Sequence, residues 1–458
     1  MDDRGLKERI PPQAVDIEMA VLGAMMLDKD AVYRTMEVLQ EEHLYKTAHQ
    51  RIFNAMSVLF AQNQVIDLIT VSEQLKKDNR LEEVGGTYYL TECTNQVTST
   101  ANVEYHARIV LEKSILRSLI SISGEITEAS YEAREDAQTL LDRAEQKIFG
   151  IGEKGLKTGF EKISPILHET MDVLEKYHRR EGKVIGIPTE FTILDELTAG
   201  FQKSDLIIIA GRPSMGKTAF SLNIARNAAV NEKIGVGFFS LEMSKFQLAT
   251  RLLSFETRID SNKLRKGKLN KDEWGRLGLA AGVLAEAPLF IDDTASLSIF
   301  ELRAKGRRLK MEHDIQMLVV DYLQLMRGPA GKDSRQQEIS EISRSLKAVA
   351  KELDVPVVAL SQLSRQPEIR GGGNRRPLLS DLRESGALEQ DADLVIFIYR
   401  PEMYSIETDE QGRPTENIAE IIVGKQRNGP TGTIRLAFLK DYARFENLAL
   451  EEAIPVPI

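Results

Sequence analysis

The sequence is poor in cysteine and tryptophan and lacks long apolar runs. Among its 458 residues Cys93 is the single cysteine, which excludes an intramolecular disulfide and a cysteine-rich zinc site. No stretch approaches the roughly 18 uninterrupted apolar residues of a membrane span. No basic segment followed by an apolar run opens the chain as a secretion signal. These absences predict a protein of the reducing cytoplasm with no membrane partner.

An excess of basic charge is also missing, since the formal net charge is −9. Residues 1–150 carry 16 Lys and Arg against 25 Asp and Glu, whereas the remainder carries 44 of each. This balance argues against nucleic-acid binding over the whole surface, although a local basic channel stays possible because fields act within about 10 Å. A chain three times the usual domain size of roughly 150 residues is expected to hold two or more domains.

Helical spacing dominates residues 1–150. Apolar residues recur three and four apart over 18–27 and 49–60, and again over 103–149 with a polar break near 130–136. We therefore predict an all-α N-terminal domain over 1–150. Glycines at 150, 152, 155 and 159 then predict a linker over 151–185, with one amphipathic helix that starts at Ser164 and Pro165. Its apolar face needs a partner in its own domain or in a neighbouring subunit.

Short apolar strands alternate with helical patterns from residue 186 to 458. Expected strands cover 206–210, 236–240, 317–320, 356–361, 394–399 and 419–423, and apolar positions over 339–353 mark a long crossover helix. This alternation predicts an α/β domain with a largely parallel sheet.

A phosphate-binding loop follows the first of these strands. The segment GRPSMGKT over 211–218 has the full G-x-x-x-x-G-K-T spacing, and a helical pattern follows at once. Such a loop wraps backbone N–H groups around phosphates, while its Lys reaches the outer phosphates and its Thr hydroxyl ligates magnesium. We predict that Mg²⁺ and ATP bind at Gly211, Ser214, Gly216, Lys217 and Thr218.

Several strand ends carry polar residues that suit nucleotide hydrolysis. The magnesium carboxylate is either Asp321 or one of the pair Asp292 and Asp293, and the cleaner apolar strand favours Asp321. Glu242 can polarise the attacking water, or it is a helix N-terminal acid. Gln362 can sense the terminal phosphate, or it is a surface glutamine.

Two basic segments lie further along the chain. Lys425 and Arg427 stand on a predicted turn that can aim an arginine at the nucleotide of an adjacent subunit, although Asn-Gly turns are common in plain hairpins. Arg365, Arg370 and the pair at 375–376 surround a glycine triplet, which suits contact with a phosphate backbone but equally describes a solvated loop.

Together these motifs resemble one known family. The series GRPSMGKT, FSLEMS, VVDYLQL, SQLSR, DLRESGALEQDAD and KQRNGPTG, preceded by RIPPQAVDIEMAVLGAMMLD, closely resembles the bacterial replicative DNA helicases of the DnaB type. The resemblance spans nearly the whole chain, in order. It implies a RecA-like motor domain with an N-terminal helical collar, joined by a linker helix that docks on the next subunit of a homohexameric ring.

The resemblance also implies roles for individual residues. Glu242 matches the catalytic glutamate, Asp321 the Walker B acid and Gln362 the phosphate-sensing glutamine. Lys425 and Arg427 match cations supplied across the subunit interface. The residues matching the loop that grips single-stranded DNA in the channel are Arg383, Glu384 and Gly386.

The resemblance implies an ATP-dependent DNA helicase that moves 5′ to 3′ at replication forks. It also implies primase and a helicase loader as partners. The segments 366–377 and 402–417 vary in length within the family, so no role is assigned to them. Alternatives are a RecA-like recombinase that forms open filaments, a small-molecule kinase, and a scaffold whose ATPase is only a switch.

Overall fold

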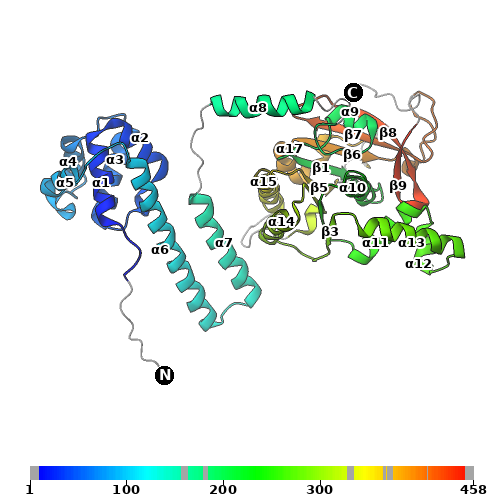
Figure 1. Cartoon of the computed structure of the whole chain (residues 1–458), viewed down its shortest axis with the longest axis horizontal. Coiled ribbons are helices and arrows are strands. Elements are labelled where there is room, and N and C mark those ends of the chain that lie inside the picture. Colours follow the sequence, from blue (N-terminus) through cyan, green and yellow to red (C-terminus); the bar gives the residue numbers. More distant parts are fainter. Residues whose placement is uncertain are drawn as a thin grey trace. The chain divides into compact units, whose positions relative to one another are not determined.

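The computed structural model describes residues 10–155, 163–178, 184–326, 335–364, 368, 375–409 and 411–448. The chain divides into two compact units, Met1–His168 and Glu169–Ile458, which are coloured blue to cyan and green to red in Figure 1. No helix among the described residues combines the length and the hydropathy that a membrane span requires. The two units are described separately below.

The first unit is built from helices around one buried helix, α1. Its helices are α1 (Val15–Leu27), α2 (Lys29–Val38), α3 (Thr47–Ala61), α4 (Leu68–Lys77), α5 (Gly86–Asn95), α6 (Val103–Glu132) and α7 (Ala137–Gly155). Six apolar side chains of α1 are buried on all its sides, which is the pattern of a central helix. At Gly23, an added Cβ would lie 2.0 Å from the carbonyl oxygen of Cys93, so the backbones of α1 and α5 touch there.

The helical spacing expected over 103–149 is confirmed by α6 and α7, and the break between them at 133–136 falls within the expected polar stretch. The expected linker glycines at 150, 152 and 155 instead lie inside α7, so that part of the prediction is wrong. An exposed helix tolerates glycine at about 1 kcal/mol each, which the surrounding good helix formers offset. The expected linker helix is α8 (Ile163–His178), which includes Ser164 and Pro165 in its first turn, where proline needs no donor.

The second unit contains one nine-stranded sheet in the order β3-β2-β4-β5-β1-β6-β7-β8-β9. The six strands from β3 to β6 are parallel, and β7 to β9 continue the sheet antiparallel. The strands are β1 (Leu206–Gly211), β2 (Val236–Ser240), β3 (Leu289–Asp292), β4 (Met317–Asp321), β5 (Val357–Gln362), β6 (Leu394–Tyr399), β7 (Ile418–Gln426), β8 (Gly432–Leu439) and β9 (Arg444–Asn447). The expected largely parallel sheet is confirmed, and the short strand β9 is an addition to it.

Helices cover both faces of this sheet. Alternate residues of β1 belong to two separate cores, because side chains of a strand point to opposite faces. One face packs against α9 (Thr192–Thr198), α10 (Lys217–Arg226) and α11 (Lys245–Thr257). The other packs against α14 (Ile299–His313), α15 (Arg335–Leu353) and α17 (Gly386–Asp391). Beyond α11, the segments α12 (Ser261–Lys266) and α13 (Lys271–Ala285) lead to β3.

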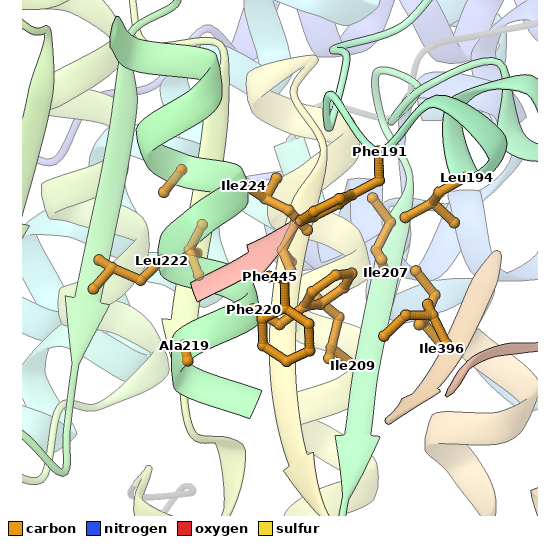
Figure 2. Packing of buried hydrophobic residues seen from close by; sticks show 14 of the residues in the cluster. Phe191, Leu194, Ile207, Ile209, Ala219, Phe220, Leu222, Ile224, Ile396 and Phe445 are labelled. Carbon is orange, nitrogen blue, oxygen red and sulfur yellow. The ribbon is translucent and has the colours of Figure 1, made fainter. Parts of the chain in front are cut away.

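An aromatic cluster fixes α10 against the sheet (Figure 2). Phe220 of α10 stacks on Phe191 with ring centroids 5.1 Å apart, and it meets Phe445 of β9 edge to face, also at 5.1 Å. Figure 2 shows these rings beside Ile207 and Ile209 of β1. The loop after β1 leads directly into α10. Packing of α10 against the sheet therefore sets the position of this loop.

Candidate functional site: a nucleotide site at the carboxyl edge of the parallel strands

The phosphate-binding loop runs from the end of β1 to the start of α10, as the sequence predicts. Gly216 has φ of +100°, a left-handed conformation that favours glycine. A Cβ at this position would lie 3.1 Å from the ring of Phe445, so the loop rests directly on the antiparallel end of the sheet. Ser214 also has positive φ, 67°, which turns the loop back toward α10.

Lys217 is folded back over the loop. Its ammonium donates hydrogen bonds to the carbonyl oxygens of Gly211 at 3.0 Å and Arg212 at 3.4 Å. Burial lowers its pKa, and the nearby carboxylates of Asp321 and Glu242 partly counter that shift. The first N–H groups of α10 have no partner within the helix. This end of the helix therefore offers a cation and several N–H donors to an anion of phosphate size.

Asp321 ends β4 with 1% of its surface exposed, close enough to Thr218 for the Thr218 side chain to lower the pKa of its carboxyl. Burial, its largest perturbation, raises the pKa of this carboxyl to about 6. Its Oδ2 is buried with no hydrogen-bond partner among the described residues. A Thr hydroxyl beside an unsatisfied carboxylate oxygen fits Mg²⁺, which takes few protein ligands and completes its shell with phosphate and water.

The two competing acids have other partners. Asp292 ends the edge strand β3, where it accepts a hydrogen bond from Lys305 at 2.7 Å. Asp293 accepts the backbone N–H of Lys245 at 3.0 Å, at the start of α11. Sheet order separates β3 from β1 by three strands, whereas β5 alone separates β4 from β1. The fold thus brings Asp321, and neither alternative, next to Thr218.

Glu242 follows β2 on the exposed side of the same sheet edge. It lies close enough to Lys217 and Asp321 to perturb the pKa of each. Arg251 of α11 also faces these carboxylates, and burial lowers its pKa while Asp321 and Glu242 oppose the change. Arg251 is not among the site residues predicted from the sequence, because an arginine within an ordinary amphipathic helix belongs to no motif. The site therefore holds two cations, Lys217 and Arg251, against two acids.

Gln362 is the last residue of β5 and pairs in register with Gly211, the first residue of the phosphate loop. Its side chain is exposed at the sheet edge. Gln324 holds its backbone, accepting the Gln362 N–H at 3.3 Å and donating to its carbonyl at 3.2 Å. An amide in this position can reach a group that the loop binds.

Arg400, which the sequence analysis also missed, supports the loop from β6. Its guanidinium lies 4.1 Å above the ring of Phe438 and donates to the carbonyl of Ser214 at 3.3 Å. Glu402 pairs with the same guanidinium, so the buried charge is compensated. No spacing rule links residues 214 and 400, and only the meeting of β6 with the loop reveals the contact.

Comparison with known proteins shows the family. A model of the DnaB-like helicase C terminal domain matches residues 186–447, and a model of the DnaB-like helicase N terminal domain matches residues 10–112. The chain belongs to the DnaB-like family of replicative DNA helicases. It is 50% identical to the replicative DNA helicase DnaB of Geobacillus stearothermophilus over 96% of both chains. The replicative DNA helicase DnaC of Bacillus subtilis is 48% identical, over 97% of this chain and 96% of the relative.

A solved structure of a DnaB-like replicative helicase, described together with its interactions with primase, matches with a TM-score of 0.71 and 35% identity. The match covers 95% of this chain and all of that one. The expected fold, a RecA-like motor domain with an all-α N-terminal domain, is thereby confirmed. Use of ATP by this DnaB-like helicase accords with the loop geometry described above.

The two cations of the KQRNG segment lie at the other end of the sheet in this DnaB-like chain. Lys425 is on β7 opposite Val395, and Arg427 bonds through its N–H to the carbonyl of Asp393 at 2.9 Å. Asp393 in turn bonds to Leu206, the first residue of β1, whereas the phosphate loop follows its last residue. The length of β1 is about 17 Å at roughly 3.3 Å per residue. Arg427 therefore cannot reach the phosphate loop of its own chain.

The residues expected from the resemblance to contact DNA lie at the start of α17 and just before it. Arg383 and Glu384 belong to the 3₁₀ helix Leu379–Ser385, and Gly386 is the exposed first residue of α17. The side chains of residues 383–385 lie outside the described part. Of the four arginines near the glycine triplet, Arg376 forms a two-point ion pair with the buried Glu420. Arg365 and Arg370 lie outside the described residues.

Proposed function

We propose that this ATP-dependent replicative DNA helicase works as a homohexameric ring with its nucleotide sites at the subunit interfaces. The phosphate loop of one subunit binds ATP, and Lys425 and Arg427 of the next subunit complete the site. Cations at that place neutralise charge that develops on the transferred phosphoryl group. Hydrolysis then depends on assembly of the ring.

The observation that supports this arrangement is the position of Arg427 at the amino-terminal edge of β1. A cation about 17 Å from its own phosphate loop has no role in hydrolysis within its own chain. In a ring of head-to-tail subunits, different surfaces of neighbouring copies meet. Such packing brings Arg427 of one copy to the loop of its neighbour.

The remaining residues of the site take roles that follow from their places at the sheet edge. Thr218 and Asp321 hold Mg²⁺ with the phosphates, and the ion neutralises charge on them. Glu242 orients and polarises the attacking water. Gln362 contacts the terminal phosphate. Because Gln362 is the last residue of β5, this contact connects the bound phosphate to that strand. Arg251 adds a second cation beside the two carboxylates.

Single-stranded DNA passes through the ring and contacts Arg383, Glu384 and Gly386 of successive subunits. Contacts to phosphates carry no sequence information, and they weaken with salt because binding releases counterions. Sequential hydrolysis pulls one strand through the channel in the 5′ to 3′ direction and excludes its complement at the fork. The neutral motor unit suits this role, because assembly gathers the basic loops of six copies into one channel.

Exposed apolar side chains support assembly. On α8, the side chains of Ile163, Ile166, Leu167 and Met171 are 40–65% exposed and share one face. The motor unit exposes Phe246, Trp274 and Leu279 on α11 and α13 to between 59% and 80%. Apolar surfaces of this kind mark contacts with other chains. We propose that α8 docks on the motor unit of a neighbouring subunit.

The other partners follow from the family. The acidic N-terminal domain, 1–150, is proposed to receive primase, and a loader is proposed to place the ring on cytoplasmic DNA. The motor boundary 186–458 and the linker boundary 151–185, whose first residues belong to α7 as far as Gly155, remain proposals. The comparisons give no support to the recombinase alternative, and sizing decides it directly, because a recombinase forms a distribution of filament lengths and a helicase a closed ring of six.

Two variants test the shared site. Lys217→Ala is expected to lower the rate of ATP hydrolysis at least about a thousandfold, because the outer phosphates lose their cation. Arg427→Ala is expected to lower turnover by about 10³-fold or more while the affinity for nucleotide is retained. ATPase rates and fluorescent nucleotide binding measure the two effects. Arg108→Ala, which removes an exposed arginine from the N-terminal unit, is the matched control and should leave turnover unchanged.

The decisive experiment mixes the Lys217→Ala and Arg427→Ala proteins. Rings that contain both copies place intact phosphate loops of the Arg427→Ala chain against intact arginines of the Lys217→Ala chain. We expect a minority of interfaces to regain DNA-stimulated turnover and unwinding of forked duplexes. Wild-type turnover by Arg427→Ala alone, or no recovery in the mixture, contradicts the shared site.

A further inference from the structure

The carboxylate of Asp393 lies at the centre of the cluster that carries the two interface cations. It stands between α17 and β6 with its side chain 7% exposed. Its Oδ1 is 3.3 Å from the guanidinium of Arg427, and its backbone carbonyl accepts the Arg427 N–H at 2.9 Å. A second guanidinium nitrogen donates to the carbonyl of Gln390 at 2.7 Å. Three contacts therefore hold an arginine that is still 47% exposed.

The other oxygen of Asp393 connects this cation to the strand of the phosphate loop. Oδ2 accepts the N–H of Leu206 at 2.8 Å, and the N–H of Asp393 donates to the carbonyl of Leu206 at 2.9 Å. Lys347 of α15 also pairs with Oδ2. The ammonium of Lys347 also lies 3.9 Å from Oδ1 of Asp205, so Lys347 and Arg427 together compensate these two acids.

Lys425 is anchored to the same segment. Its ammonium donates to the carbonyls of Glu389 at 2.6 Å and Ala392 at 2.8 Å, at the carboxyl end of α17. A cation at this end of a helix satisfies carbonyls that lack intrahelical partners. Both interface cations are thus fixed to the short stretch 389–393, which ends in Asp393.

From this geometry we propose that Asp393 is the positioning residue for Arg427. Its carboxylate holds the guanidinium at the sheet edge, in the orientation in which the 427–429 turn presents it to the nucleotide of the next subunit. An arginine side chain has several free torsions, and fixing them before the nucleotide arrives removes an entropic cost from the reaction. The same carboxylate ties that arginine to the strand that leads into the subunit's own phosphate loop. The inference rests on the proposed shared site.

The test places Asp393→Asn on one chain at a time in mixed rings. The Lys217→Ala chain supplies only the cations, and the Arg427→Ala chain supplies only the phosphate loop. With Asp393→Asn added to the Lys217→Ala chain, we expect the recovered turnover to fall about tenfold or more, because the arginine is no longer oriented. With Asp393→Asn added to the Arg427→Ala chain, we expect the recovered turnover to stay unchanged. The KM for ATP should not move in either mixture.

Each result is decisive. A loss of equal size in both mixtures, or a loss confined to the chain that supplies the phosphate loop, means that Asp393 acts on the fold or on its own site and overturns the proposal. Unchanged turnover in both mixtures overturns it too. Absence of recovery in the parent mixture, without any change at 393, is a failure of the shared site itself and is therefore distinguishable.

Two further variants guard against a folding defect. Asp393→Glu keeps the charge that Lys347 pairs with and displaces the carboxylate by one methylene, so it gives the same asymmetric loss if rings with asparagine fail to assemble. Asp354→Asn removes an exposed acid, paired with Lys203 at 2.9 Å, from the same edge of the sheet. Since exposed pairs contribute little, this control should leave both mixtures unchanged.

Discussion

Two buried carboxylates, Glu18 in the helical unit and Asp321 in the motor unit, differ in their hydrogen bonding. In the helical unit, Glu18 is 1% exposed and accepts the Tyr45 N–H at 2.7 Å and a hydrogen bond from His49 at 2.6 Å. The other ring nitrogen of His49 bonds to Tyr89 at 2.8 Å. In the motor unit, Asp321 is buried to the same degree, yet its Oδ2 has no partner among the described residues.

The difference is the one expected between a structural acid and an acid proposed to hold a metal ion. A buried polar group that is fully hydrogen-bonded contributes to the fold, whereas one left unsatisfied costs free energy that a ligand can recover. Glu18 joins α1, α3 and the turn before α3 in a closed network. Asp321 instead has an oxygen without a hydrogen-bond partner beside the phosphate loop, where a cation is proposed to bind. The two residues should therefore respond oppositely to the loss of their charge.

Asp321→Asn is expected to give the largest effect. ATP turnover should fall by about a thousandfold, equivalent to about 4 kcal/mol in the barrier, because a neutral amide is a poor partner for Mg²⁺. ATPase assays measure it. Asp293→Asn, which changes the same residue type at the end of β3, is the control and should retain most of the activity. Equal losses of turnover in both variants would contradict the assignment of the magnesium carboxylate to Asp321.

The same variant carries a prediction about pH. The pKa of Asp321 is raised to about 6 in the folded state, above the 3.8 of the free side chain. Its ionised form therefore destabilises the nucleotide-free protein, and this penalty appears as the pH rises from about 4 through 6. Thermal unfolding should show Asp321→Asn more stable than wild type at pH 8, with the gain absent at pH 4. A gain that is independent of pH would contradict the assignment.

Glu18→Ala should lower the stability of the protein and leave its ATP turnover unchanged. Removing the carboxylate leaves the Tyr45 N–H and His49 buried without their acceptor, at a cost of about 2–4 kcal/mol in the stability of the helical unit. Hydrogen exchange over residues 15–110 of the full chain measures the loss. Turnover of ATP below the unfolding temperature should stay near that of wild type. Glu73→Ala, which breaks the exposed pair with Lys76, is the control and should change stability by less than about 1 kcal/mol.

Gly23→Ala should give the smallest of these effects, again on stability alone. Its Cβ would meet the Cys93 carbonyl at 2.0 Å, so α1 and α5 must separate, at about 1–3 kcal/mol. Gly124→Ala places the same methyl group on α6, where nothing lies within 4 Å, and should stabilise by about 0.5–1 kcal/mol. Thermal unfolding distinguishes the two signs, and destabilisation by both would show that helix contacts are not the cause.

Much of the site is readable in the sequence because its residues are local to strand ends. The phosphate loop needs only eight consecutive residues, and Glu242, Asp321 and Gln362 each follow an apolar run. The carboxyl ends of parallel strands meet at one edge, so their grouping could be anticipated. The preference for Asp321 over Asp293 came from its cleaner apolar strand and from the family resemblance. Its physical basis, the place of β4 and β3 in the sheet relative to β1, is a long-range property that the sequence pattern does not show.

Arg251 and Arg400 escaped the sequence analysis for a different reason. Neither belongs to a motif, and each reaches the site through a contact between elements far apart in the chain. The glycines of 150–155 were misread because composition alone cannot say whether flanking helix formers outweigh them. Here the propensity of a single residue type proved weaker than the helix around it.

The amino-acid sequence by itself determined the family, the two-part architecture and the chemistry at the carboxyl edge of the sheet, because these depend on local patterns. Only the tertiary structure decided where the charges stand: that Asp321 has an unsatisfied oxygen beside Thr218, and that Arg427 lies at the far edge, held by Asp393. The physical reason is that burial and hydrogen bonding, which set the properties of a charge, arise only when distant segments pack together.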